Sequence, residues 1–335
     1  LVKSALMIFY SCDRYLNSHP VKKVILSHAV YIQYGILARL AVDKGIAVYM
    51  FSKWGTQVVH KLRRSHWLSS SNHLQYKSIF TSLDDKESRL AKAREKIIHR
   101  LSGGIDAGIS YVKISGYSAN VDLSNRVMKD TDRPRVVVML HCFYDSPHIY
   151  KSMLFPDFCE WLDFTLTVLE TVEVDVYVKP HPGGLDGNEE VIKGFMARYP
   201  SVLLIDKEVP NNQLIAEGLD AVVTVYGTIG HEFPYQGVPV ITAGDNPHAL
   251  YSFCNHAKSK SEYKWLISNV TKLAKNISQS EIEEFFYMHY LHVGGGRLAG
   301  SNDIFKLADK IGRTDSLAAL VEDAQSGGFD DVDAH

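Results

Sequence analysis

The sequence has few cysteines, no excess of charge and no long apolar run. Its four cysteines, Cys12, Cys142, Cys159 and Cys254, are widely spaced and form no CxxC pair, which fits a reducing compartment better than a disulfide framework. The 36 Lys and Arg nearly balance the 38 Asp and Glu, so a nucleic-acid partner is not indicated. No apolar run reaches the roughly 18 residues that span a bilayer, and no signal-peptide pattern is present. These absences predict a cytoplasmic protein.

What the chain does have is enough apolar sequence for more than one core. Of its 335 residues, 46% are hydrophobic and 22% are charged, which suggests about two domains. Residues 127–135 are mostly polar, contain Pro134 and precede a strong strand, so we place the boundary there. The predicted parts are a first domain (1–132), a second domain (133–305), a terminal helix (306–324) and a disordered tail (325–335). The chain starts at Leu1 in mid-pattern, which leaves open whether a further strand precedes it.

Strand-like and helix-like apolar patterns alternate along both halves. Strands are predicted at residues 5–10, 24–27, 46–51, 136–140, 174–178, 202–205, 221–225 and 238–243. Helices are predicted at residues 36–44, 84–101, 158–170, 189–199, 212–218, 230–236, 261–274, 280–289, 302–310 and 316–324. This rhythm implies parallel strands joined by right-handed crossovers. The predicted fold class is therefore α/β, with two Rossmann-like domains that face a central cleft.

The most informative segment is a glycine-rich turn between a strand and a helix. The strand at 221–225 runs into the turn at 226–230, and the helix after it begins with His231 and Glu232. A helix that starts at such a turn leaves its first N–H groups unpaired and its positive dipole end open to an anion. Upstream, the strand at 174–178 ends in Lys-Pro-His-Pro-Gly-Gly. Two strand ends thus present polar groups where an open α/β sheet binds ligands.

Three segments in this order resemble a known family. They are Val-Lys-Pro-His-Pro (178–182), Thr-Val-Tyr-Gly-Thr-Ile-Gly-His-Glu (224–232) and Gly-Val-Pro-Val-Ile (237–241). Together with the loop at 141–148 they resemble bacterial glycosyltransferases of capsule and lipopolysaccharide biosynthesis, among them sialyl- and Kdo-transferase-like members with an HP motif. The resemblance covers about residues 134–300 and implies a GT-B-like fold. It also implies a nucleotide-sugar donor, CMP- or UDP-linked, in the second domain, and an oligosaccharide or lipid-linked sugar acceptor in the first. Peripheral attachment to the inner face of the membrane stays open, because such sugar acceptors are often lipid-linked.

The departing phosphate of such a donor needs stabilisation, which backbone N–H groups and an imidazole can supply without a metal. We expect Gly227, Thr228 and Gly230 to provide the backbone donors and one hydroxyl. His181, fixed between two prolines, would donate to the phosphate or the leaving oxygen, and Lys179 could add charge. The alternative for the turn is a tight connection, and for His181 a turn cap.

Three further residues are assigned to the donor site. Glu232 could accept hydrogen bonds from ribose hydroxyls, or it could only favour the helix dipole. His231 is equally compatible with a solvent-facing helix position and with the site. Asn246 could line the donor-sugar pocket, although Asn-Pro is also a common turn initiator.

The sugar acceptor loses a proton as it attacks, and a positioned Asp, Glu or His can take it. Asp145, in the loop after the strand at 136–140, is one candidate base, and an Asx-type turn is its alternative. His28, at the end of the strand at 24–27, is another, and a satisfied polar group at a turn is its alternative; His148 and Asp106 are further candidates. If the reaction retains anomeric configuration, no base of this form is needed.

Metal-binding patterns are weak, and no metal or other cofactor is expected. HExxH and Cys/His clusters are absent. The Asp-x-Asp spacings at 130–132 and 331–333 lie in the linker and the tail rather than after a strand, which argues against a metal-dependent GT-A transferase. A nucleotide-sugar epimerase, a polyol-phosphate transferase and a non-catalytic sugar-nucleotide-binding subunit remain alternative functions.

Overall fold

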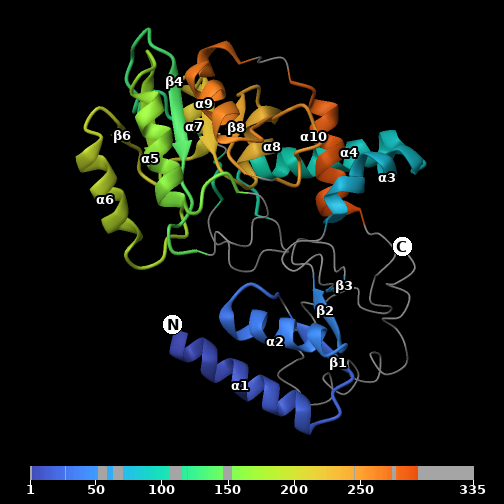
Figure 1. The fold of residues 1–335 in the computed structure, drawn as a ribbon. Coiled ribbons are helices and arrows are strands. Elements are labelled where there is room, and N and C mark those ends of the chain that lie inside the picture. The colour runs from blue at the N-terminus through green and yellow to red at the C-terminus, as the bar shows by residue number, and fades with distance from the viewer. Residues whose placement is uncertain are drawn as a thin grey trace. The chain divides into compact units, whose positions relative to one another are not determined.

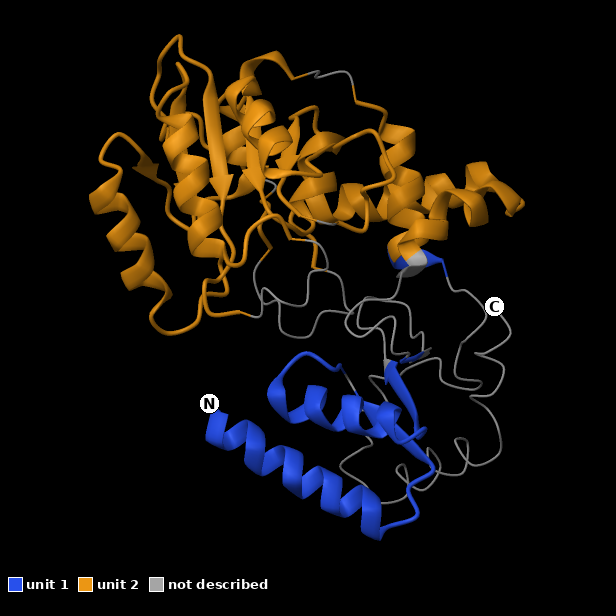
Figure 2. Cartoon of the chain, in the orientation of Figure 1, with its two compact units in different colours: residues 1–71, 290–335 blue, residues 72–289 orange. Residues whose placement is uncertain are grey.

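The computed structural model describes residues 2–26, 28–51, 59–62, 71–105, 115–118, 120–145, 153–244, 246–273 and 277–292. Contacts divide the chain into two compact units (Figure 2). Unit 1 comprises Leu1–Ser71 with Tyr290–His335, and unit 2 comprises Asn72–His289. The helices predicted at 302–310, 306–324 and 316–324 and the predicted tail at 325–335 lie outside the described residues.

Unit 1 is a small α/β unit. Its elements are α1 (Val2–Ser18), β1 (Lys23–Leu26), α2 (Ile32–Asp43), β2 (Ala47–Phe51) and β3 (Val59–Lys61). β1 and β2 pair in parallel, and β3 pairs antiparallel with β2 (Figure 1). Ala38 and Ala41 are fully buried, and such small side chains let α2 pack closely on its neighbours.

The strand predicted at residues 5–10 is wrong, because these residues lie in α1. An uninterrupted apolar run suits a buried strand or a helix equally, so its periodicity does not decide between them. Here the helix continues to Ser18, packs on α2 and buries Leu16. Tertiary packing therefore decided the conformation of this segment.

Unit 2 is built on a six-stranded sheet. Its strands are β4 (Arg135–Met139), β5 (Asp175–Lys179), β6 (Leu203–Leu204), β7 (Ala221–Thr224), β8 (Val240–Thr242) and β9 (Asn255–His256). Every pair is parallel, in the spatial order β6-β5-β4-β7-β8-β9. β4, β5, β7 and β8 are almost wholly buried, as expected of parallel strands covered on both faces. The predicted α/β class with parallel strands is confirmed.

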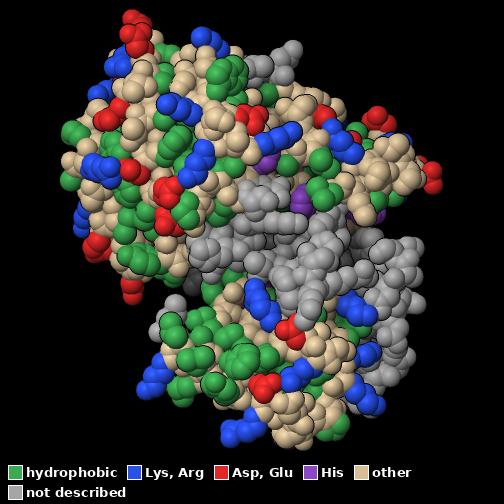
Figure 3. Space-filling view, viewed as in Figure 1, with side chains coloured by type: hydrophobic (Ala, Val, Ile, Leu, Met, Phe, Trp, Pro, Cys, Tyr) green, Lys and Arg blue, Asp and Glu red, His purple; other side chains and the backbone are tan. Residues whose placement is uncertain are grey.

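The helices of unit 2 pack on this sheet and on one another (Figure 1). They are η1 (Ser71–Gln75), α3 (Tyr76–Ser82), α4 (Lys86–Leu101), α5 (Phe158–Leu169), α6 (Asn188–Arg198), α7 (Asn211–Ala216), α8 (Ile229–Tyr235), α9 (Lys260–Ser268), η3 (Val270–Lys272), α10 (Gln279–Phe286) and η4 (Tyr287–Leu291). The buried Trp161 of α5 donates its indole N–H to the hydroxyl of Tyr263 in α9, at 2.7 Å. On the face shown in Figure 3, acidic and basic side chains of unit 2 are interspersed.

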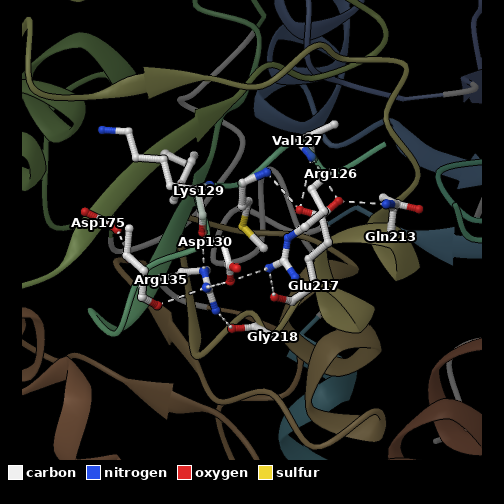
Figure 4. Close-up of polar contacts among 12 residues, drawn as sticks. Arg126, Val127, Lys129, Asp130, Arg135, Asp175, Gln213, Glu217 and Gly218 are labelled. Atoms are coloured by element: carbon white, nitrogen blue, oxygen red, sulfur yellow. Dashed lines mark hydrogen bonds and ion pairs between the residues drawn. The ribbon is translucent and has the colours of Figure 1, made fainter. Parts of the chain in front are cut away.

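The segment predicted as a domain linker is part of unit 2. Glu217, which is buried just after α7, accepts hydrogen bonds from the backbone N–H groups of Val127 and Met128 at 2.8–3.1 Å (Figure 4). Gln213 donates to the same carboxylate at 2.7 Å. A buried carboxylate with three donors fixes the chain that carries them. The compact units therefore have different bounds from the two predicted domains, and α3 and α4 belong to unit 2.

Among the described helices, none combines the length and the hydropathy that a membrane span requires. How the two predicted domains face each other stays a prediction.

Candidate functional site

The strand order of unit 2 reverses between β4 and β7. The chain builds the sheet outward through β4, β5 and β6, then returns to β7 on the other side of β4. Right-handed crossovers then place the helices after β4 and after β7 on opposite faces, which opens a crevice where ligands bind in such sheets. Register aligns the carboxyl ends, since Met139 pairs with Lys179 and Thr224 pairs with Thr242. The loops after these strands carry most of the predicted site residues.

Two side chains hold the glycine turn after β7. The Tyr226 N–H donates to Nε2 of His141 at 3.2 Å, and the Gly227 N–H donates to Oδ1 of Asn246 at 3.2 Å. Asn246 is 1% exposed, and its amide group donates to the carbonyls of Val225 and Gly244 at 3.1 and 3.0 Å. Asn246 thus fixes the turn, with all of these contacts inside the protein; its predicted place in a sugar pocket stays a prediction.

The backbone donors of this turn differ from those predicted. Gly227 is bonded to Asn246, and the Gly230 N–H donates to the Gly227 carbonyl at 3.2 Å. Within the described part of the chain, the N–H groups of Thr228 and Ile229 have no hydrogen-bond acceptor, and neither has the Thr228 hydroxyl. A Cβ on Gly227 would meet no atom within 4 Å, so space is open there, and its φ of +114° requires glycine. The available backbone donors are therefore those of Thr228 and Ile229.

Gly230 is required for packing. Its position faces the ring of His248, which is 1% exposed and packs against Phe253 and Phe285. A Cβ on residue 230 would overlap Cε1 and Nε2 of that ring. The glycine therefore lets the imidazole pack on the first turn of α8, and its predicted role at the donor site stays a prediction.

Gly230→Ala is expected to destabilise the protein by about 1–3 kcal/mol, because the methyl group overpacks a filled interior. Urea unfolding would measure the loss. Gly194→Ala is a matched control, since Gly194 lies in α6 and a Cβ there meets nothing within 4 Å. That substitution should be neutral or stabilising, by up to about 1 kcal/mol. Equal effects at the two positions would contradict the packing role.

His181 lies at the exposed end of the loop that follows β5. Its Nδ1 accepts the Gly183 N–H at 3.0 Å, which assigns the proton of the neutral ring to Nε2. Within the described residues, no group bonds to that Nε2. Burial by the surrounding protein lowers the pKa of His181, and the charge of Lys179 lowers it further. The hydrogen bond from the Gly183 N–H and the charge of Asp145 act in the opposite direction. The ring is a neutral hydrogen-bond donor near pH 7.

Asp145 lies close enough to His181 for its charge to act on that ring. The loop that carries it is held to unit 2 in two places. The Phe143 N–H donates to Oδ1 of the buried Asn188 at 2.9 Å, and the Leu185 N–H donates to Sγ of Cys142 at 3.3 Å. Asp145 is exposed, and its N–H donates to the Cys142 carbonyl at 3.2 Å. The structure thus brings together two of the three predicted catalytic residues, and their catalytic roles stay predictions.

Lys179 is 5% exposed and turns toward the loop after β6. Its Nζ donates to the Lys207 carbonyl at 3.3 Å. Burial lowers its pKa to about 8, while Glu208 and Asp206 act in the opposite direction. The ammonium therefore has a protein partner, and it influences His181 through its charge.

Glu232 is buried and already bonded inside unit 2. Its Oε1 accepts from Nε of Arg100 in α4 at 2.5 Å, and its Oε2 accepts from the Tyr117 hydroxyl at 3.1 Å. The carboxylate is thereby held in an ion pair that joins α4 to α8. A role toward ribose hydroxyls stays a prediction and would require these contacts to be shared or exchanged.

His231 is 3% exposed and lies among aromatic rings of α10, so the solvent-facing alternative is wrong. Three imidazoles surround Phe285, with ring centroids 5.2 Å away for His231, 5.6 Å for His248 and 5.2 Å for His289. Burial lowers the pKa of His231 and His248 well below the usual value, and that of His289 to about 4. Protonation of this cluster is therefore opposed by the fold.

Acid should destabilise unit 2 before its carboxylates titrate. An unfolded histidine has a pKa near 6.5, so between about pH 6.5 and 5 the unfolded chain binds more protons than the folded one. The free energy of unfolding then falls as pH falls, by up to about 1.4 kcal/mol per pH unit for each such histidine. Urea unfolding across this range would measure the slope, and His289→Gln should reduce it. A flat profile would contradict the buried neutral cluster.

His28 belongs to unit 1. Its ring packs edge-on against Tyr31 and Tyr34, with centroids 5.2 and 4.7 Å apart. These contacts give it a local packing role, and its predicted role as a base stays a prediction. Within the residues that the structure describes, no three His, Cys, Asp or Glu side chains group as metal ligands.

His141 and Arg100 were not among the predicted site residues. His141 could have been found, because it follows a predicted strand whose carboxyl end shares an edge with the glycine turn. Arg100 could not, because it reaches Glu232 across 132 residues of sequence.

No protein-family model matches the chain, and no curated protein matches it. Two solved structures of KpsC from Thermosulfurimonas dismutans resemble it. The beta Kdo 2,4 transferase is 17% identical with a TM-score of 0.49, and the match covers 76% of this chain and 75% of the transferase chain. The beta Kdo 2,7 transferase is 15% identical with a TM-score of 0.48, and the match covers 82% of this chain and 78% of the transferase chain. A UDP-GlcNAc 2-epimerase from Neisseria meningitidis is 13% identical with a TM-score of 0.38, and the match covers 85% of this chain and 79% of the epimerase chain.

The motifs in the sequence resemble glycosyltransferases of capsule and lipopolysaccharide biosynthesis, and the similar structures include two Kdo transferases.

Proposed function

We propose that this chain is a metal-independent glycosyltransferase that moves a sugar from a nucleotide-sugar donor to a growing surface polysaccharide of capsule or lipopolysaccharide type. The observation that carries the proposal is the arrangement at the β4/β7 switch point. There, a neutral imidazole follows β5, and two backbone N–H groups follow β7, on the two sides of β4; among the described residues, neither its Nε2–H nor these N–H groups have an acceptor. His141, at the end of β4, lies between them: it accepts the Tyr226 N–H, and a charge on His181 lowers its pKa.

This set of donors suits the chemistry of a departing phosphate. A hydroxyl oxygen of the sugar acceptor attacks the anomeric carbon, and the bond from that carbon to the phosphate oxygen breaks. The nucleotide leaves with the electron pair, so negative charge grows on the phosphate. Preorganised hydrogen-bond donors stabilise such charge most effectively. His181 Nε2–H, the Thr228 and Ile229 N–H groups and the Thr228 hydroxyl would serve here.

The fate of the acceptor proton distinguishes two versions of this reaction. In an inverting reaction a base takes the proton directly, and Asp145 in unit 2 and His28 in unit 1 are the proposed candidates. The sugar acceptor would be an oligosaccharide or a lipid-linked chain, and a lipid-linked one would bring the protein to the membrane surface. The donor would be CMP- or UDP-linked.

A donor panel tests the proposal. The purified chain would be incubated with UDP-, CMP-, GDP- and CDP-linked donors, with and without EDTA, and the released nucleotide and the sugar products would be measured. Hydrolysis or transfer that survives EDTA supports the proposal. Interconversion of the donor sugar would indicate an epimerase instead, and transfer from CDP-linked donors alone a polyol-phosphate transferase. Binding without turnover would indicate a non-catalytic subunit.

A further inference from the structure

We propose that His141 is a positioning residue that holds the glycine turn in the conformation that receives the donor phosphate. The inference rests on the proposed function and adds to it a residue that the motifs did not mark. His141 would not touch the donor. It would act through Tyr226, whose N–H it accepts at 3.2 Å.

The first step concerns how His141 itself is held. Its ring stacks on Phe158, with centroids 4.6 Å apart and planes 12° apart, and Phe158 is 2% exposed at the start of α5. His141 follows Leu140, whose N–H extends the β4 ladder by donating to the Lys179 carbonyl at 2.9 Å. The ring is therefore fixed by a buried aromatic and by the sheet.

The second step concerns its protonation. Only an unprotonated Nε2 can accept the Tyr226 N–H, so the bond requires the neutral ring with its proton on Nδ1. Burial lowers the pKa of His141 to about 3, and the neighbouring His181 acts in the same direction. The bond therefore persists throughout the range in which an enzyme of this kind would work.

The third step concerns the turn. His141 fixes the Tyr226 amide and Asn246 fixes the Gly227 amide, so both peptide groups that lead into Gly227, with its φ of +114°, are held in place. The two amides that follow, on Thr228 and Ile229, are the ones without an acceptor in the described part of the chain. A fixed turn removes the cost of orienting these donors when a phosphate arrives. His141 thus supplies preorganisation from the adjacent strand.

Two substitutions at residue 141 test this role. His141→Leu fills similar volume without a hydrogen-bond acceptor, and His141→Gln places an amide oxygen near the position of Nε2. Selective ¹⁵N-tyrosine labelling, with Tyr226→Phe to assign the signal, reports hydrogen exchange at the Tyr226 amide. Calorimetry with CMP and with UDP reports affinity, and thermal unfolding reports stability. Tyr199→Phe is the control, because it removes hydrogen bonds to Asp163 and Thr167 far from this edge.

We expect His141→Leu to lose the protection of the Tyr226 amide and to weaken binding of the preferred nucleotide about tenfold. His141→Gln should restore both, and Tyr199→Phe should change stability alone. If the wild-type chain binds a nucleotide and His141→Leu binds it equally well, the positioning role is overturned while the proposed function stands. Weaker binding that Gln does not rescue would also overturn it, by indicating general loss of structure. If the wild-type chain binds neither nucleotide, the proposed function fails and the inference fails with it.

Discussion

His181→Ala is expected to lower donor turnover by about a hundredfold or more. The ring holds its proton on Nε2 because Nδ1 accepts the Gly183 N–H at 3.0 Å. Loss of one preorganised donor to a developing negative charge commonly costs about 10²–10³ in kcat. The loss should appear mainly in kcat, since the interaction strengthens as the phosphate departs. Steady-state kinetics with the active donor would measure it.

Two further variants sharpen this prediction. His181→Gln keeps an N–H donor near the position of Nε2 and should recover part of the rate. His19→Ala removes an exposed histidine of unit 1 and should leave the rate unchanged. Because His181 is exposed, the alanine variant should keep the stability of the wild-type protein. An unchanged turnover in a folded His181→Ala protein would remove the main support for the proposed chemistry.

Arg100→Met is expected to lower the free energy of unfolding by about 3 kcal/mol, more than any other single substitution proposed for this protein. The Arg100 side chain is 24% exposed and its partner Glu232 only 4% exposed, so the substitution leaves a buried carboxylate without its cation. Breaking a buried pair by removing one partner costs about 3–5 kcal/mol, and the remaining exposure of Arg100 places the value at the lower end. Urea unfolding would measure it.

The matched control is Arg198→Met, which breaks a surface pair with Asp163 whose side chains are 62% and 34% exposed. Surface pairs contribute little, so the change should be small. The double variant Arg100→Met with Glu232→Met should recover much of the loss, because no buried charge remains. If Arg100→Met lowered the free energy of unfolding no more than Arg198→Met, the ion pair between α4 and α8 would not stabilise the fold.

A substitution of Glu232 distinguishes its two possible roles, the structural ion pair with Arg100 and a contact with ribose hydroxyls. Glu232→Gln keeps the volume and the contact with Tyr117, but it removes the charge. A purely structural carboxylate predicts lower stability with unchanged nucleotide affinity per folded molecule. A ribose contact predicts a weaker affinity as well, which calorimetry with CMP and UDP would detect.

The parallel sheet of unit 2 could be predicted because its strands are continuous apolar runs between clear turns. The predicted strands at 136–140, 174–178 and 221–225 correspond to β4, β5 and β7 within one or two residues. The helices predicted at 158–170 and 230–236 are confirmed as α5 and α8. Local periodicity carries this information, because a parallel strand is buried on both faces and a crossover helix on one.

The packing and hydrogen-bond partners of individual residues could not be predicted in the same way. Gly230 belongs to a motif that suggests an anion, yet its lack of a Cβ accommodates His248. Glu232 belongs to the same motif, yet it meets Arg100 from a helix far upstream. Such pairings depend on contacts between distant parts of the chain, which residue spacing does not encode.

The sequence by itself determined the α/β class, the parallel order of strands and helices in unit 2, and the edge at which its polar loops gather. Each of these follows from apolar periodicity and from the geometry of parallel sheets. Tertiary structure alone decided that residues 5–10 form a helix, that residues 127–128 are fixed by Glu217, and that His141 holds the turn after β7. These outcomes depend on which side chains burial brings together, because a buried polar group bonds to whichever partner the packing places within reach.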